Sequence, residues 1–124
     1  MSLMRSSAAH MGVAFLAMGG WAVWANLGHP MPRPVVAGLV QGCMSALITL
    51  LLKRMIERLG AALPGLAALL VPPVAAVLIS LALLTTMHRL AGTPEIARTI
   101  ALPLTVTFVY ASLYSHALWS HRHG

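Results

Sequence analysis

Residues 63–90 of the sequence read LPGLAALLVPPVAAVLISLALLTTMHRL, and Arg89 is the first charged residue among them if histidine is counted as neutral. A helix needs about 20 apolar residues to cross a bilayer, so this run is longer than one crossing requires. Pro72-Pro73 interrupts the run, and proline removes a backbone N–H donor and bends or starts a helix. We therefore expect an interfacial segment at 61–70 and a membrane span at 72–88, with a break near Pro72-Pro73.

The composition of the whole chain agrees with a membrane protein. Of its 124 residues, 59% are apolar and 8% are charged, whereas a soluble domain has about 45–50% apolar and about 25% charged residues. So few charges do not cover the surface of a small soluble fold. The net charge of +6 comes from basic residues scattered between apolar runs. This pattern favours contacts with anionic membrane lipids and excludes nucleic acid as a partner.

Three further apolar runs predict membrane spans at 8–28, 34–52 and 94–118. The fold is therefore expected to be all-α: one polytopic membrane domain over residues 1–124, with four transmembrane helices in two hairpins. Pro103 lies inside the last span and is expected to kink it. Carbonyl groups that lose a partner at proline need donors from Ser or Thr side chains, water or a neighbouring helix, because lipid offers none.

Basic residues near the ends of the spans predict the orientation, because cytoplasmic loops carry an excess of Lys and Arg. One side of the predicted membrane has Arg5, Lys53, Arg54, Arg58 and Arg122. The other side has Arg33, Arg89 and Arg98. Five basic residues against three predict that both termini are cytoplasmic.

Polar residues recur at helical spacing in the second span of each hairpin. In the first hairpin they are Gln41, Ser45, Thr49 and Lys53. In the second hairpin they are Arg98, Thr105, Ser112 and His116. Because polar groups are costly in lipid, such stripes mark either hydrogen bonds between helices or a substrate path. In the second alternative, the two stripes face each other across the path.

The three cations Lys53, Arg54 and Arg58 lie within six residues at one predicted interface. Such a cluster attracts phosphate by charge, and Arg also binds it with two parallel hydrogen bonds. We expect the cluster to hold the head group of an anionic lipid, with the two polar stripes supplying selective contacts and Arg98 receiving the head group on the other side. The alternative is that these cations only set the topology.

Small residues form a second pattern in the span at 34–52. Gly38 and Gly42 are a GxxxG pair, which Ala46 extends by one turn. This spacing predicts a close helix-packing face, for a homo-oligomer or for a partner helix. It supports an alternative function, in which the chain is a non-catalytic accessory subunit of a larger membrane complex.

The six histidines and eight methionines raise the alternative of a haem or copper protein. The histidine pairs that would resemble haem ligands are His10 with His116 and His29 with His88. Met4, Met11 and Met18 repeat every seven residues, and thioether ligands suit Cu(I). However, the histidines are predicted at the interfaces, and methionine is also an ordinary packing residue. We therefore predict no cofactor and no metal site.

The remaining sequence signals are negative. The single cysteine, Cys43, excludes an intramolecular disulfide and a Cys-based zinc site, and its apolar surroundings predict that it is buried. We see no pairing of a nucleophile with a base and no glycine-rich phosphate loop, so an enzyme is not expected.

Two sets of residues occupy corresponding places in the two hairpins. The first set is Pro34, Ala37, Thr49, Lys53 and Arg54. The second set is Pro94, Ala97, Thr107, Phe108 and Trp119. In this layout the chain resembles the GtrA-like family of small bacterial membrane proteins. The resemblance implies a bacterial inner-membrane location and a part in translocating polyprenyl-phosphate-linked sugars for surface polysaccharide or lipid glycosylation, as a transporter or flippase component.

Overall fold

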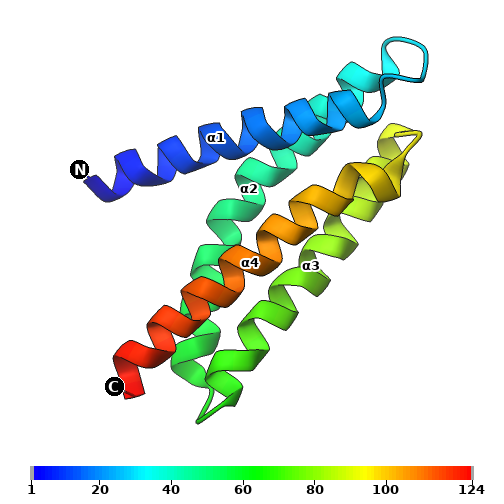
Figure 1. Ribbon diagram of the computed structural model, residues 1–124. Helices are drawn as coiled ribbons and strands as arrows, with labels where there is room; N and C mark the ends of the chain where they lie inside the picture. Colours follow the sequence, from blue (N-terminus) through cyan, green and yellow to red (C-terminus); the bar gives the residue numbers. More distant parts are fainter. Residues whose placement is uncertain (1, 124) are drawn as a thin grey trace.

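Four α-helices make up the fold, as Figure 1 shows. The structure is a computed structural model that describes the backbone of residues 2–123 and the side chains of residues 8–123. The helices are α1 (Ser2–Ala25), α2 (Arg33–Ala62), α3 (Ala67–Ala91) and α4 (Ile96–His123). Each helix is long and apolar enough to cross a membrane, which confirms the predicted all-α membrane fold with four spans. The side chain of Arg5, which entered the count of basic residues, lies outside the described residues.

Successive helices run in opposite directions and form two hairpins (Figure 1). The connections at 26–32 and 92–95 lie together at one end of the bundle, which we call the His29 end. The turn at 63–66 lies at the opposite end with the C-terminal end of α4, and we call this the Gly65 end (Figure 1). With 30 residues α2 is about 45 Å long, so it extends beyond a hydrocarbon core of about 30 Å.

The predicted break in the third span is wrong, because Pro72 and Pro73 lie inside the uninterrupted helix α3. Residues 61–70, where an interfacial segment is expected, divide between the end of α2, the turn at 63–66 and the first turn of α3, and their place at the membrane surface stays a prediction. Helix α3 begins at Ala67, five residues before the expected start of the span at residue 72.

A side chain of α4 explains why α3 continues through its prolines. In an α-helix the amide of residue i bonds the carbonyl of residue i−4, so Pro72 and Pro73 leave the carbonyls of Ala68 and Leu69 without a helical partner. The Ser115 hydroxyl donates to the Leu69 oxygen at 2.8 Å and lies 3.4 Å from the Ala68 oxygen. The expected donation by a Ser or Thr side chain is thus confirmed at this site.

The proline of α4 is accommodated in the same way. Pro103 lies inside α4, and its missing amide leaves the Thr99 carbonyl without a helical partner. The indole N–H of Trp21, on α1, lies 3.1 Å from both the Thr99 and the Arg98 carbonyl oxygens. A neighbouring helix therefore supplies the donor, whereas the kink expected at Pro103 stays a prediction.

The glycine face of α2 packs against α1 of the same chain. A Cβ atom added at Gly19 would lie 2.9 Å from the Gly38 carbonyl oxygen, and one added at Gly42 would lie 2.9 Å from the Phe15 carbonyl oxygen. The helix-packing face is therefore confirmed, but it is used within the chain. Helix α1 covers Gly38 and Gly42. The face formed by Gly38, Gly42 and Ala46 is therefore not open at these two glycines to a second copy of the chain or to a partner helix.

Helices α2, α3 and α4 share the apolar core, and α1 lies beside them. The core consists of Ile48, Leu52, Ile56, Ala76, Leu84, Ile100 and Ala111. In Figure 1, α1 and α4 are close at the His29 end and diverge toward the N-terminus. This divergence places the first half of α1 away from α4.

Candidate functional site

A cavity of about 350 Å³ lies between the diverging helices α1 and α4, with α2 along one side. Most of its lining is apolar, with Val13 and Ala17 from α1 and Val106 from α4, and Leu84 of α3 also reaches it. Val13 and Val106 are exposed, so the cavity opens to the surface between these helices. In a protein that spans a membrane, this opening faces the lipid.

Three residues of the predicted α2 stripe line this cavity. Ser45, Thr49 and Lys53 follow one another at intervals of four residues, and all three contribute to the wall. The Thr49 hydroxyl donates to the Ser45 carbonyl oxygen at 2.7 Å, within the helix. Lys53 is half-buried and forms no ion pair among the described side chains. The cavity therefore has one polar wall that ends in a cation.

The fourth member of the stripe, Gln41, is fully buried and begins a chain of hydrogen bonds between helices. Its amide nitrogen donates to Ser45 Oγ at 2.7 Å, and its Oε1 lies 2.8 Å from His88 Nε2. Since Oε1 only accepts, His88 Nε2 carries the hydrogen. His88 Nδ1 lies 2.7 Å from Thr93 Oγ1, so neutral His88 accepts the Thr93 hydroxyl. This series of hydrogen bonds connects Thr93, at the His29 end, to Ser45 in the cavity wall.

The predicted stripe on α4 points away from the cavity. Arg98, Thr105 and His116 are exposed, and the Thr105 hydroxyl donates to its own helix at the Ala101 carbonyl, 2.8 Å away. Ser112 is half-buried. The expectation that the two stripes face each other is therefore wrong.

Different residues of α4 line the cavity, namely Pro103, Val106, Thr107 and Tyr110. At about 100° per residue, Thr105, Ser112 and His116 lie on the opposite side of the helix from Pro103. The helical spacing correctly placed the residues of the α4 stripe on one face of the helix, but it did not indicate whether that face points inward or outward. Thr107 and Tyr110 lie on the same face as Pro103, and this second polar pattern in the sequence could have indicated the face that lines the cavity.

The basic cluster on α2 is divided between two surfaces. Lys53 lines the cavity, whereas Arg54 and Arg58 are exposed and border a separate depression with Leu51, Met55 and Leu59. The reason is helical geometry, because Arg54 is turned by about 100° from Lys53 while Arg58 lies only about 40° from Arg54. The three cations therefore do not form one head-group site.

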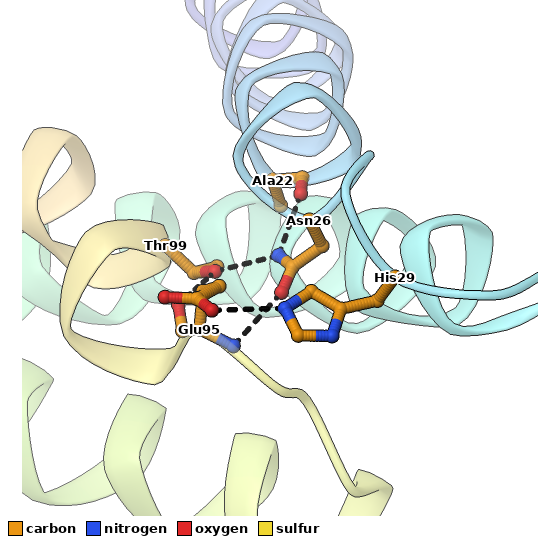
Figure 2. Close-up of polar contacts among 5 residues, drawn as sticks. All are labelled: Ala22, Asn26, His29, Glu95 and Thr99. Atoms are coloured by element: carbon orange, nitrogen blue, oxygen red, sulfur yellow. Dashed lines mark hydrogen bonds and ion pairs between the residues drawn. The ribbon is translucent and has the colours of Figure 1, made fainter.

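A second polar cluster joins α1 to α4 at the His29 end, and Figure 2 shows it. Asn26 is fully buried; its amide nitrogen donates to Thr99 Oγ1 and to the Ala22 carbonyl, both at 2.8 Å. Its Oδ1 accepts the Glu95 backbone N–H at 3.0 Å. Glu95 also pairs with His29 at 2.8 Å. These contacts fasten the two helices at this end, while the cavity separates them further along.

Two of the four histidines considered as haem ligands are held in other contacts, whereas His10 lines the cavity and His116 is exposed. His88 uses both ring nitrogens toward Thr93 and Gln41, and His29 pairs with Glu95. Within residues 8–123, no three His, Cys, Asp or Glu side chains come together as metal ligands. Cys43 is exposed, so its predicted burial is wrong: it lies on the face of α2 that points away from the core.

Comparisons of the chain with protein-family models, curated proteins and solved structures found no match. The four apolar helices and the cavity between α1 and α4 define the chain as an α-helical, multi-pass membrane protein with a lateral cavity. Its resemblance to the GtrA-like family stays a prediction.

Proposed function

We propose that this integral membrane protein binds an anionic, lipid-linked substrate in the lateral cavity and takes part in its transport, as a transporter or flippase component. One observation carries the proposal: the apolar cavity opens between α1 and α4 and has the cation of Lys53 in its wall. An amphiphile has the matching chemistry, with a hydrocarbon chain for the apolar walls and an anion for the ammonium group.

The size of the cavity suits a single hydrocarbon chain. Its volume of about 350 Å³ is near the lower limit of ligand pockets, which range from about 300 to 1,000 Å³. Because the opening faces lipid, a substrate enters sideways without leaving the membrane. Lys53 forms no ion pair with the described side chains, so its charge is available to a phosphate or carboxylate.

The GtrA-like resemblance supports a prenyl-phosphate substrate and a bacterial inner-membrane location within this proposal. With both termini cytoplasmic, Lys53 lies in the cytoplasmic half of the bundle, where such a substrate is loaded. The accessory-subunit alternative loses its main support, since α1 covers the glycines at 38 and 42.

A binding measurement on two neighbouring cations tests the proposal. The probe is farnesyl phosphate, a single prenyl chain with a phosphate, titrated into the purified chain in nanodiscs of zwitterionic lipid. We expect Lys53→Gln to raise the Kd about tenfold, because a hydrogen bond to a charged group contributes about 1.5–3 kcal/mol. Arg54→Gln is the matched control: it removes the same charge one residue away, outside the cavity. Equal affinities for the parent and both variants, or equal losses in both variants, would contradict the proposal.

A further inference from the structure

Six polar side chains form one row across the bundle: Lys53, Thr49, Ser45 and Gln41 on α2, His88 on α3, and Thr93 after it. We propose that this polar row is the path of the substrate's polar head group, and that the structure shows the path open at the Gly65 end and closed at the His29 end. This inference depends on the proposed function, since it describes how a substrate held in the cavity crosses the membrane.

The row is long enough to cover most of the membrane. From Lys53 to Gln41 it rises twelve residues along α2, which is about 18 Å. His88 and Thr93 continue it to the connection at the His29 end. A hydrocarbon core of about 30 Å therefore contains polar side chains at nearly every level of this one track.

The half of the row from Lys53 to Ser45 is open. All three of its members line the cavity, which reaches the surface between α1 and α4. Ser45 Oγ accepts a hydrogen bond from Gln41, and no hydrogen bond among the described residues uses the Ser45 hydroxyl as a donor. A buried donor without a partner costs about 1–3 kcal/mol, so a water or an oxygen of the substrate is favoured at this point.

The half of the row from Gln41 to Thr93 is closed. Gln41 and His88 are fully buried, Thr93 is 7% exposed, and none of them lines the cavity. Their side chains bond one another at 2.7–2.8 Å, which leaves no gap for a head group. Polar groups are expensive inside a membrane and usually mark a pathway there. A head group rich in oxygen atoms offers these side chains replacement hydrogen bonds as they separate, so opening does not leave them unpaired.

Cysteine accessibility tests the path without a known substrate. The parent carries Cys43→Ala. The reporter is Thr49→Cys, because Thr49 lines the cavity and does not belong to the buried hydrogen-bonded residues Gln41, His88 and Thr93. The anionic, membrane-impermeant reagent methanethiosulfonate ethylsulfonate is added to intact cells or to inverted vesicles. The exposed positions Met31 and Leu66, changed singly to Cys, show which preparation presents which end.

We expect the reporter to react from the Gly65 end only. Gln41→Ala removes the bridge between Ser45 and His88 and is expected to raise the reaction rate from the His29 end about tenfold, which corresponds to about 1.4 kcal/mol in the opening equilibrium. Thr93→Val, which removes only the last hydroxyl, is expected to act in the same direction and keeps the test valid if Gln41→Ala does not fold. Ser80→Ala is the control, because Ser80 is fully buried on α3 but has no hydrogen-bond partner in the described part of the chain.

Three results would overturn the path. They are a reporter that does not react from the Gly65 end, a reporter in the parent background that reacts equally from both ends, and folded Gln41→Ala and Thr93→Val variants that behave like Ser80→Ala.

The accessibility results are independent of the farnesyl phosphate binding measurement. If the probe binds through Lys53 while accessibility fails, the binding proposal stands and the path is wrong. If accessibility behaves as expected and Lys53→Gln binds the probe as the parent does, the path is hydrated and gated but carries a different substrate, and the proposed function is wrong.

Discussion

The Ser115 hydroxyl on α4 donates a hydrogen bond to the Leu69 carbonyl oxygen on α3, 2.8 Å away. This carbonyl is the one that Pro73 deprives of its helical partner, so the bond both satisfies a buried acceptor and joins the two helices. Trp21 and the Thr99 carbonyl form the equivalent pair at Pro103. The bundle thus accommodates prolines in two membrane spans with donors from neighbouring helices, as the absence of water in lipid requires.

Ser115→Ala is expected to destabilise the bundle by about 1–3 kcal/mol, since it leaves a buried carbonyl unpaired. The free energy of unfolding is measured in mixed micelles by titration with dodecyl sulfate. Pro73→Ala restores an amide for Leu69, so Ser115→Ala is expected to cost less in that background. An equal cost in both backgrounds would show that the bond does not act through the proline. Ser112→Ala, at a half-buried position, is the control.

Trp21→Phe keeps an aromatic ring but removes the indole N–H that reaches the Thr99 carbonyl. We expect a loss of about 0.5–1.5 kcal/mol in the same unfolding measurement, the usual net contribution of one hydrogen bond. Trp24→Phe is the matched control, because Trp24 is exposed and its N–H has no partner among the described residues. Similar losses in the two variants would assign the effect to the indole ring rather than to the hydrogen bond.

Two adjacent glycines on α1 are expected to respond oppositely to alanine. At Gly19 a new Cβ lies 2.9 Å from the Gly38 carbonyl, so Gly19→Ala pushes α1 away from α2 and costs about 1–3 kcal/mol. At Gly20 no atom lies within 4 Å, so Gly20→Ala stabilises the helix by about 0.5–1 kcal/mol. Thermal unfolding of both variants in detergent measures the difference. If Gly19→Ala were as stable as Gly20→Ala, the close packing of α1 on α2 would be refuted.

Reporter fusions test the orientation. Both connections at the His29 end are expected outside the cytoplasm, and the turn at 63–66 inside, because more basic residues lie at the Gly65 end. A reporter active only in the periplasm, inserted after residue 31 or after residue 92, is expected to be active. The same reporter after residue 65 or at the C-terminus is expected to be silent. Activity at the C-terminus would reverse the orientation and place Lys53 on the outer side.

Much of the fold followed from the sequence alone. Length and hydropathy determined four spans, because a segment of about 20 apolar residues has few stable alternatives to a membrane-spanning helix. Spacing determined that Ser45, Thr49 and Lys53 share one face of α2, and all three line the cavity. The GxxxG pattern identified a packing face, since small residues allow two helices to approach closely.

Tertiary structure decided which face meets which neighbour. Periodicity fixes the relative positions of Thr105 and His116 on a helix, but not the rotation of that helix, and α4 turns both outward. The break expected at Pro73 does not occur because Ser115, 42 residues further along the chain, supplies a donor. His88 and Gln41 likewise meet across 47 residues. Each of these contacts depends on how separate helices pack, and packing brings together residues that no local pattern relates.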